Sequence, residues 1–374
     1  MEFFMDFFSL PSWQQLVMMV IGGVLIFLAI RHNMEPALLL PIGFGAILVN
    51  LPLSGAVTQV IDEVTEVGAL DVLFNAGIAN ELFPLLLFIG IGAMIDFGPL
   101  LSNPKMLLFG AAAQFGIFFT LSMAALLGFD LKDAASIAII GAADGPTSIF
   151  VANYFHSNYV GAIIVAAYSY MALVPIVQPP VIRLITTKKE RMIRMPYEPK
   201  EISKTTRILF PIVVTIIAGL VAPRSVALIG FLMFGNLIRE CGVLGSLSES
   251  AQKELANLIT LLLGITVAAR MQADAFLTWE TLMILGLGLV AFIFDTVGGV
   301  LFAKVLNLFS KKKVNPMIGA AGISAFPMSS RVVHKMGLKE DPQNFLLMHA
   351  AGANVSGQIA SVIAGGLIIK LIAG

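Results

Sequence analysis

A single carboxylate stands in the middle of a long apolar segment. Asp144 belongs to the stretch "GAADGPTSIF", which lies inside the apolar run of residues 134–155. Pro146 has no backbone N–H and its ring displaces the preceding helical turn, so we expect the helix to break here and free its carbonyl oxygens. With the hydroxyls of Thr147 and Ser148, these groups would form an oxygen-rich site for a hard cation such as sodium.

Two interpretations of Asp144 stay open at this level. An ionised carboxylate at the centre of a bilayer costs about 2.5–3.5 kcal/mol on insertion scales, so it needs a partner. The sequence has no Lys or Arg between Lys132 and Arg183. The partner is therefore either a bound cation or a polar group from elsewhere in the fold, in which case Asp144 is a helix cap or a structural contact.

A second apolar segment with helix-breaking residues offers partners for Asp144. Residues 315–333 read "NPMIGAAGISAFPMSSRVV" and repeat the "GAA" of the first segment, with Gly322 where that segment has Asp144. If the two breaks meet, Asn315 and Ser324 could join the carboxylate. The alternatives are a helix start at the Asn-Pro pair and a backbone hydrogen bond within its own helix for Ser324.

Further polar side chains occur in apolar surroundings. Arg331 could extend its charge to the aqueous boundary, or bind an incoming carboxylate, which its guanidinium matches in shape. Tyr170 and Asn354 occupy corresponding places in the two halves of the chain, and a buried phenol needs a partner. Asp295 is a second carboxylate in an apolar run. It could relay a proton or cation, although we favour a structural ion pair with Arg270.

Composition defines the class of protein. Of the 374 residues, 58% are hydrophobic and 12% charged, whereas soluble domains carry roughly 25% charged residues. This is typical of a polytopic helical membrane protein. The net charge of zero gives no indication of a nucleic-acid partner, and one cysteine excludes an intrachain disulfide. The four histidines lack metal-site spacing, and the N-terminus lacks the basic region of a signal peptide.

The predicted fold is all-α and polytopic. A spanning helix needs about 20 mostly apolar residues. Ten segments are predicted to cross the membrane: 13–30, 37–52, 81–98, 104–128, 158–187, 207–222, 226–240, 254–269, 277–309 and 345–373. Two further segments, 134–155 and 315–333, are rich in Gly, Pro, Ser and Ala, and we expect them to be broken.

Charge predicts the orientation. The stretch from Thr187 to Arg207 holds seven basic and three acidic residues, and Lys311–Lys313 is a second basic cluster. The positive-inside rule places both in the cytoplasm. Residues 53–81 carry five acidic residues and no Lys or Arg, so this loop and the N-terminus are expected outside.

The first and second halves of the chain share weak sequence similarity. "FGAILVN" (44–50) aligns with "FGNLIRE" (234–240) and "IIGAADG" (139–145) with "MIGAAGI" (317–323), and two later pairs keep the same order. We therefore predict a duplication.

The duplication divides the chain into three parts. Repeat 1 comprises residues 1–186 with a re-entrant hairpin at 134–155, residues 187–206 form a basic cytoplasmic loop, and repeat 2 comprises residues 207–374 with a re-entrant hairpin at 315–333. Each repeat would then have five full crossings. Because five is odd, the repeats would be inverted, an arrangement that places binding sites at the midplane where broken helices meet.

Four stretches carry a resemblance to a known family. "GAADGPTSIFVA", "YSYMALVPIVQPP", "NPMIGAAGISAFPMSSRV" and "GANVSGQIAS" resemble the membrane-embedded beta subunit of biotin-dependent, sodium-ion-translocating decarboxylases, which act on oxaloacetate, methylmalonyl-CoA, glutaconyl-CoA or malonate. The resemblance runs over nearly the whole chain. It implies an enzyme subunit that decarboxylates carboxybiotin, consumes a proton and exports sodium.

The resemblance also implies roles for particular residues. The catalytic residues fall on Asp144, Tyr170 and Arg331. The cation-binding residues fall on Asp144, Asn315, Gly319, Ser324 and Asn354, and the sodium ion is expected at Asp144, Asn315, Ser324 and Asn354.

The remaining implications concern cofactors and partners. Sodium and carboxybiotin would be required, the latter carried by a separate biotin carrier protein. A carboxyltransferase alpha subunit, small membrane-anchoring subunits and a homo-oligomeric, trimeric core in the bacterial inner membrane are implied as well. The residues alone fit a second class equally, a sodium-coupled secondary transporter of an organic anion. A structural membrane anchor is a third, which a carboxylate without a nearby basic residue disfavours.

Overall fold

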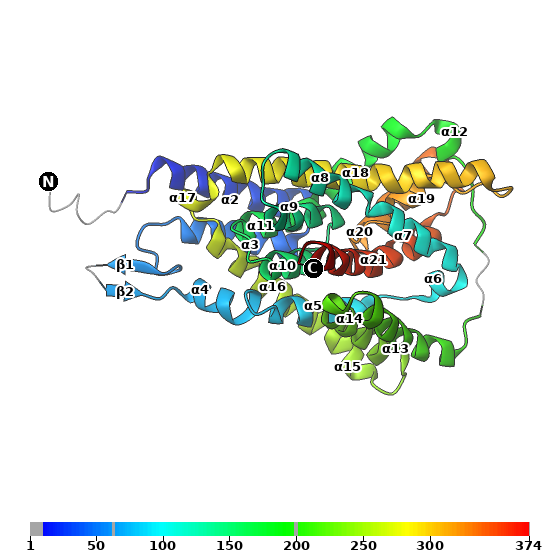
Figure 1. The fold of residues 1–374 in the computed structure, drawn as a ribbon, viewed down its shortest axis with the longest axis horizontal. Helices are drawn as coiled ribbons and strands as arrows, with labels where there is room; N and C mark the ends of the chain where they lie inside the picture. The colour runs from blue at the N-terminus through cyan, green and yellow to red at the C-terminus, as the bar shows by residue number, and fades with distance from the viewer. Residues whose placement is uncertain (1–9, 62–63, 198–200, 374) are drawn as a thin grey trace.

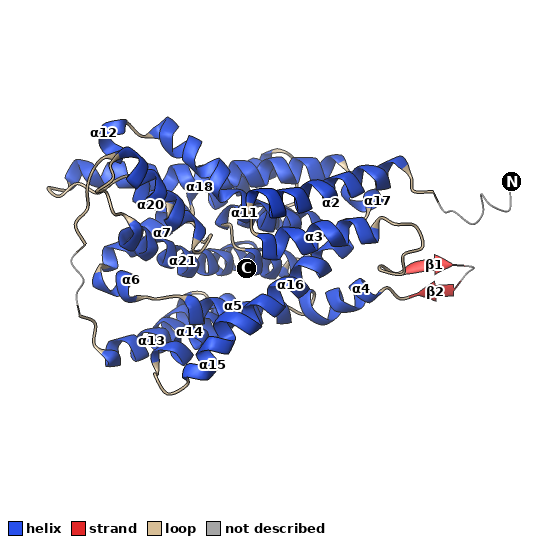
Figure 2. Ribbon diagram, turned by 180° about the vertical axis from the view of Figure 1, so that it is seen from behind, coloured by secondary structure: helices blue, strands red, loops and turns tan. Residues whose placement is uncertain are grey.

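The described residues are mostly helical and include one short two-stranded sheet. The computed structural model describes residues 10–61, 64–197 and 201–373. Figures 1 and 2 show a bundle of helices with the antiparallel strands β1 (Gln59–Ile61) and β2 (Val64–Glu66) projecting at one end.

In the described part of the chain, six helices are long and apolar enough to cross a membrane, which confirms the predicted all-α polytopic fold. They are α2 (Trp13–His32), the run η2–α7–α8 (Pro104–Leu126), α11 (Val160–Ile185), α13 (Lys204–Val221), α18 (Trp279–Phe309) and α21 (Leu347–Ala373). A bent pair, α4 and η1 (Ala69–Ile78) followed by α5 (Leu82–Met94), is a seventh candidate span with an angle of 61° between its parts.

Shorter helices occupy the other predicted spans. They are α3 (Pro36–Val49), α14 (Val226–Glu240) and α16 (Ala256–Val267). Each of the ten predicted segments therefore contains a helix. The number that cross the membrane, and with it the count of five crossings per half, stays a prediction.

Several short elements connect these helices. They are α6 (Gly98–Ser102), α12 (Lys188–Arg191), α15 (Gly245–Ser250), α17 (Ala273–Phe276), η4 (Pro223–Ser225), η5 (Ala251–Leu255) and η6 (Ala268–Arg270). Within the run η2–α7–α8, η2 (Pro104–Met106) leads into α7 (Leu107–Ala113), and Gln114 separates α7 from α8 (Phe115–Leu126).

Both segments predicted to be broken are broken. The first consists of α9 (Leu131–Ala138) and η3 (Ile139–Ala142), a non-helical step at residues 143–144, and α10 (Gly145–Tyr154). The second consists of α19 (Met317–Ala320), non-helical backbone at residues 321–327, and α20 (Met328–Glu340).

The helices differ in how much of their surface the protein covers. Within an apolar window of 18 residues in each helix, only 11% of α13 and 17% of α2 are buried, against 56% of α11 and 67% of α21. Large apolar side chains of α13 such as Leu209, Ile216 and Leu220 are exposed. In a polytopic membrane protein such faces contact lipid, whereas α11 and α21 form the centre around which the broken segments lie.

The two ends of the molecule differ in charge. The long helix α18 runs between them, with Trp279 near α17 and its far end near α12 (Figure 1). Lys304 of α18 pairs with Glu190 of α12 at 3.2 Å. The predicted basic loop lies at this α12 end, and the predicted acidic loop with β1 and β2 lies at the opposite end. Asp62, Glu63 and residues 198–200 of these two loops lie outside the described residues.

Candidate cation site at two helix breaks

The first broken segment, named hairpin 1 (Leu131–Tyr154), returns to the end of the molecule where it begins. Asp133 lies in its first turn and accepts hydrogen bonds from the Ser157 hydroxyl at 2.6 Å and the Asn158 N–H at 3.3 Å. Those two residues directly follow its last turn. The arms α9 and α10 also contact each other.

The second broken segment, named hairpin 2 (Asn315–Glu340), starts and ends at the opposite end. Asn315 and Asn344 both donate a side-chain N–H to the carbonyl of Arg191 in α12, at 2.8 and 3.0 Å. Arg191 also pairs with Glu340, the last residue of α20, at 2.8 Å. Both arms of hairpin 2 are therefore attached to α12.

The two hairpins meet at their breaks, as the sequence predicts. Ser324 of hairpin 2 donates to the carbonyl of Ala142 in hairpin 1 through its N–H at 3.2 Å and its hydroxyl at 2.9 Å. The next residue, Ala143, has φ of +51°, a left-handed conformation that ends η3. The break in hairpin 1 therefore places Asp144 beside the break in hairpin 2.

Asp144 is buried and contacts hydroxyl groups. Its side chain is 3% exposed. Its Oδ2 accepts hydrogen bonds from Thr147 Oγ1 at 2.5 Å and from Ser361 Oγ of α21 at 3.1 Å. Among the described residues, no Lys, Arg or His pairs with it. Since an unneutralised buried carboxylate is costly, this site favours either a proton or a bound cation.

One face of α21 supplies polar groups to both breaks. Asn354, Gln358 and Ser361 stand at positions i, i+4 and i+7, which share a helix face. Asn354 Nδ2 donates to the carbonyl of Ile323 at 2.7 Å, and Gln358 Nε2 donates to the carbonyl of Ser324. Because a carbonyl oxygen can only accept a hydrogen bond, each of these bonds must come from a side-chain NH2 group. This fixes the orientation of both side-chain amides. Within the described parts of the chain, Asn354 Oδ1 and Gln358 Oε1 are left buried without a hydrogen-bond partner, although such oxygens are good sodium ligands.

Of two tyrosines on α11, the structure places Tyr168 next to Asp144. A Cβ added at Gly145 would lie 2.7 Å from Tyr168 OH, so this hydroxyl adjoins the residue after Asp144. Tyr168 is fully buried, and its hydroxyl has no hydrogen-bond partner among the residues that the structure describes. The predicted Tyr170 instead donates to the carbonyl of Leu285 in α18. Residues two apart on a helix point about 200° apart, so the two phenols lie on opposite faces.

The structure does not bring Asn315 to the carboxylate. Its amide donates to the carbonyls of Arg191 and Ile193, and its Oδ1 accepts from the N–H of Met317. This matches the alternative weighed above, a helix start, with Asn315 also anchoring hairpin 2 at its base. Because its amide is used at the base of hairpin 2, a contact between Asn315 and Asp144 is not confirmed and stays a prediction.

Gly319 and Ser324 are used for packing. A Cβ at Gly319 would lie 1.9 Å from the carbonyl oxygen of Gly299 in α18, so only glycine allows this close approach. Both the N–H and the hydroxyl of Ser324 are engaged in joining the hairpins. These contacts give Gly319 and Ser324 a role in positioning the break.

Arg331 lies exposed on α20. Burial raises the pKa of Glu35, the residue before α3, and the positive charge of Arg331 opposes the rise. Among the described residues Arg331 has no ion pair within 4 Å. Its charge is therefore available to an anion from solution.

Asp295 does not pair with Arg270, so that expectation is wrong. Asp295 Oδ1 accepts the N–H of Ile117 at 3.1 Å, at the start of α8 where the break at Gln114 leaves amides unpaired. The guanidinium of Arg270 instead lies over the ring of Phe74 at 4.0 Å from its centroid. Asp295 thus has a different partner, a helix N-terminus, and the choice between a structural role and a relay stays open.

Sequence reasoning missed three residues of this site: Tyr168, Gln358 and Ser361. The stretch "NVSGQIAS" does contain a signal, since Asn354, Gln358 and Ser361 repeat at the spacing of one helix face. Nothing comparable separates Tyr168 from Tyr170, because α11 is apolar on every side.

The fold and the site together define a class: a polytopic helical membrane protein with a buried carboxylate at two touching helix breaks. Residues 14–372 match the family described as the Na+-transporting oxaloacetate decarboxylase beta subunit. The chain belongs to this family, which confirms the resemblance found in its motifs.

Individual relatives act on different substrates. Over 95% of its length, the chain is 50% identical to methylmalonyl-CoA decarboxylase subunit beta of Propionigenium modestum, covering 94% of that protein. It is 48% identical to glutaconyl-CoA decarboxylase subunit beta of Acidaminococcus fermentans, with 97% of this chain and 94% of the relative aligned. It is 44% identical to the oxaloacetate decarboxylase beta chain of Haemophilus ducreyi, with 96% and 95% aligned. This chain is thus a membrane subunit of a sodium-pumping decarboxylase.

Proposed function

We propose that this subunit decarboxylates carboxybiotin held on a separate biotin carrier protein and couples the reaction to sodium export. In the reaction the bond between the ring nitrogen and the carboxyl carbon breaks. The electron pair stays on nitrogen, which takes up a proton, and carbon dioxide leaves. The observation that carries the proposal is Asp144, a buried carboxylate at the contact between two helix breaks without a basic partner in the described chain.

We propose a sodium site made by oxygen atoms around this carboxylate. Asp144 supplies the charge, and the hydroxyls of Thr147 and Ser361 already contact it. Asn354 and Gln358 present the two unpartnered amide oxygens on the same face of α21. Of the sodium ligands expected from sequence, our proposed site keeps Asp144 and Asn354. Ser324 positions the break and is not a ligand in this proposal, and Asn315 is not included.

Proton coupling follows from the chemistry of one carboxylate. Ionised Asp144 attracts sodium, whereas protonated Asp144 loses its charge and releases the ion. The proton that biotin consumes could therefore be exchanged for sodium at this residue. The buried hydroxyl of Tyr168 beside Gly145 is a closer candidate for proton transfer than Tyr170, whose hydroxyl is bonded to a main-chain carbonyl.

An inverted duplication accounts for the order and packing of the helices. Helix α5 of the first half and helix α16 of the second half occupy corresponding positions in the duplication. Each packs against a helix of the other half: α5 against α14, and α16 against α3. Likewise α11 packs on α18, while α21 packs on α7. Reciprocal contacts of this kind are expected from a two-fold relation, and hairpins that begin at opposite ends support opposite insertion of repeats 1 and 2.

We place the α12 end in the cytoplasm of a bacterial cell, by the positive-inside rule. Arg331 would attract the carboxylate of carboxybiotin from that side. The partners would be the biotin carrier, a carboxyltransferase alpha subunit and small anchoring subunits around a homotrimer. Because the relatives use methylmalonyl-CoA, glutaconyl-CoA or oxaloacetate, we assign the substrate class as a carboxylic acid or acyl-CoA of this set.

The test is carbon dioxide release from carboxybiotin carrier by the subunit in liposomes, followed together with labelled sodium. We expect sodium to stimulate release and to accumulate inside. Sodium movement that ignores carboxybiotin would instead make the chain a sodium-coupled transporter of an organic anion and would refute the proposed coupling.

A further inference from the structure

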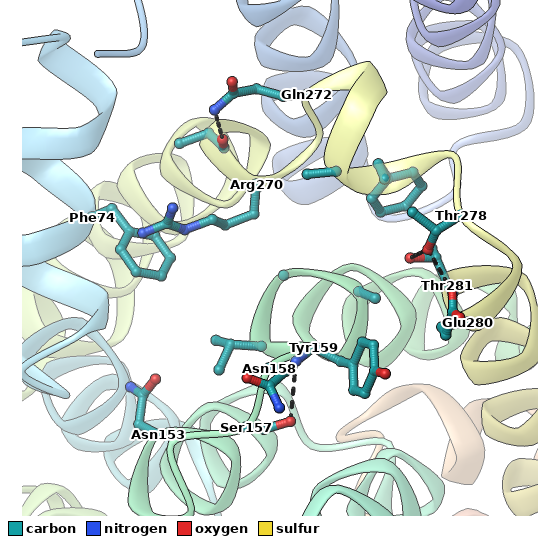
Figure 3. A pocket seen from close by; sticks show the side chains of 16 residues that line it. Phe74, Asn153, Ser157, Asn158, Tyr159, Arg270, Gln272, Thr278, Glu280 and Thr281 are labelled. Atoms are coloured by element: carbon teal, nitrogen blue, oxygen red, sulfur yellow. Dashed lines mark hydrogen bonds between the residues drawn. The ribbon is translucent and has the colours of Figure 1, made fainter. Parts of the chain in front are cut away.

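A cavity of about 500 Å³ opens at the base of hairpin 1. Figure 3 shows it between the start of α11, with Asn158 and Tyr159, and the segment from η6 to α18, with Arg270, Gln272 and Thr278. The volume is that of roughly 17 water molecules at about 30 Å³ each, so a hydrated ion fits. Neither the sodium site nor the carboxybiotin side of the protein includes it.

The cavity lies at the end of the molecule opposite the basic loop. One wall is Phe74, from the segment that carries the acidic residues. Asn153, which also lines the cavity, donates its side-chain amide to the carbonyl of Ile78 in the same segment at 2.8 Å. Under the assigned orientation, this end faces the outside of the cell.

The polar groups of the cavity suit a cation. Glu280 lines the cavity, and the carboxylate of Asp133 accepts hydrogen bonds from two other lining residues, Ser157 and Asn158. Asp133 is held there by Ser157. The one basic lining residue, Arg270, is stacked on Phe74 against the opposite wall, with a distance of 4.0 Å to the ring centroid (Figure 3).

Two helices lead from the cavity to Asp144. Asn153 is nine residues from Asp144 along α10, or about 14 Å at 1.5 Å per residue. On α11 the lining residue Ala162 precedes Tyr168 by six residues, or about 9 Å. The floor of the cavity and the carboxylate are therefore separated by only two to three helical turns.

Apolar side chains fill this interval. Ile149 of α10 and Ile164 and Val165 of α11 are at most 4% exposed. They belong to one packed cluster that runs from Phe74 at the cavity wall to Tyr168 beside the carboxylate. Such a layer excludes water and ions between two polar compartments.

We propose that this cavity is the outer vestibule through which sodium leaves the site at Asp144, with Ile149, Ile164 and Val165 as the closed outer gate. The inference rests on the proposed pump function and adds the route of exit. Hydrated monovalent cations are the ligand class, held weakly by carboxylates and neutral oxygens.

The test uses single cysteines in the Cys241→Ser background, which removes the one native thiol. Ala275→Cys lines the cavity and Val64→Cys lies exposed on β2 at the same end. Spheroplasts are treated with a bulky, membrane-impermeant maleimide, and inverted vesicles are then assayed for carboxybiotin-driven uptake of labelled sodium. We expect both thiols to react, sodium uptake to fall at least fivefold for Ala275→Cys, and Val64→Cys to be unaffected.

Equal sodium uptake by labelled and unlabelled Ala275→Cys would overturn the vestibule while leaving the pump intact. Absence of carboxybiotin-driven uptake in the unlabelled proteins would instead remove the proposed function. A second variant, Ile149→Ala, thins the gate without touching the cavity lining. It should raise passive sodium leak through the liposome membrane at least threefold, and a leak equal to that of the parent protein would contradict the assigned gate.

Discussion

Hairpins 1 and 2 have the same outline but differ in charge at their breaks, which is negative in hairpin 1 and neutral in hairpin 2. Each begins and ends at one end of the molecule, breaks after a "GAA" sequence, and touches the other at that break. Hairpin 1 places the carboxylate of Asp144 there, supported by hydroxyls. Hairpin 2 has Gly322 in its place, and side-chain amides hold the carbonyls freed at its break.

The difference teaches how a duplicated scaffold can hold one ion. Two carboxylates at touching tips would repel each other and need two cations. With one carboxylate, the break of hairpin 2 carries no charge and forms a neutral wall of the proposed ion site. Amides from Gln178, Asn354 and Gln358 each donate to a carbonyl of that wall, at Ala320, Ile323 and Ser324.

The largest expected effect comes from removing the charge of hairpin 1. Asp144→Asn should lower decarboxylation and sodium transport together by about 10²–10³-fold, the scale for losing one preorganised electrostatic group. Asp295→Asn is the matched control, because its side-chain oxygen can still accept the N–H of Ile117. Rates are measured in liposomes. Decarboxylation by Asp144→Asn at the parent rate would refute the shared site.

A second prediction concerns hairpin 2, which should not tolerate a side chain at its break. A Cβ at Gly322 would lie 2.4 Å from the carbonyl oxygen of Phe109, so Gly322→Ala should destabilise the fold by about 1–3 kcal/mol, as overpacking does. Gly23→Ala on α2 meets no atom within 4 Å and should be neutral or stabilising. Thermal unfolding in detergent compares the two variants. Equal melting temperatures would show that hairpin 2 has room for a side chain.

A smaller effect is expected at Gln358, where a variant distinguishes sodium binding from structural support of hairpin 2. Gln358→Leu removes both the donor to Ser324 and the unpartnered amide oxygen. We expect the sodium concentration for half-maximal decarboxylation to rise about tenfold, equivalent to about 1.4 kcal/mol. Gln178→Leu loses a comparable bond to Ala320 but lies off the α21 face. An equal sodium shift in both variants would assign Gln358 to support alone.

Arg331 should affect the carrier more than the ion. Arg331→Ala should raise the apparent KM for carboxybiotin carrier about three- to tenfold, by loss of one exposed attractive charge, with the sodium dependence unchanged. Lys335→Ala on the same helix is the control. Steady-state rates at varied carrier concentration decide the matter. An unchanged KM would remove Arg331 from carrier recognition.

The smallest effect concerns the attachment of the basic loop. Hydrogen bonds and charge from Arg194 hold the pKa of Asp341 below its usual 3.8. A lowered pKa means that this contact stabilises the fold fully above about pH 4, and that the contribution is lost as the pH falls through the folded-state pKa. Melting temperatures between pH 3 and pH 7 should therefore converge for the parent and Asp341→Asn at the acidic end. A constant difference would contradict this linkage.

Much of this arrangement could be predicted from sequence because breaks leave strong local signals. Gly145-Pro146 and the isolated charge of Asp144 mark hairpin 1, and the repeated "GAA" marks its partner. The predicted contact between the breaks is present. Helix positions followed from apolar length, which lipid burial requires.

The differences from expectation concern directions around and along helices. The role expected of Tyr170 stays a prediction. Tyr168, two residues earlier, was missed because an apolar helix buried on several sides gives no periodic signal to choose between the two tyrosines. Asn315 belongs to the same motif as Ser324 but lies at the base of the arm, because α19 and the break separate them. Asp295 was assigned a charged partner, although backbone amides at a helix start can hold a carboxylate as well.

The most direct test of the central claim is sodium binding by the purified subunit, measured by calorimetry in two buffers of different ionisation enthalpy. If Asp144 exchanges a proton for sodium, binding should release up to one proton per ion in the parent protein, and both binding and release should disappear in Asp144→Asn. Sodium binding of unchanged affinity in Asp144→Asn would contradict the account.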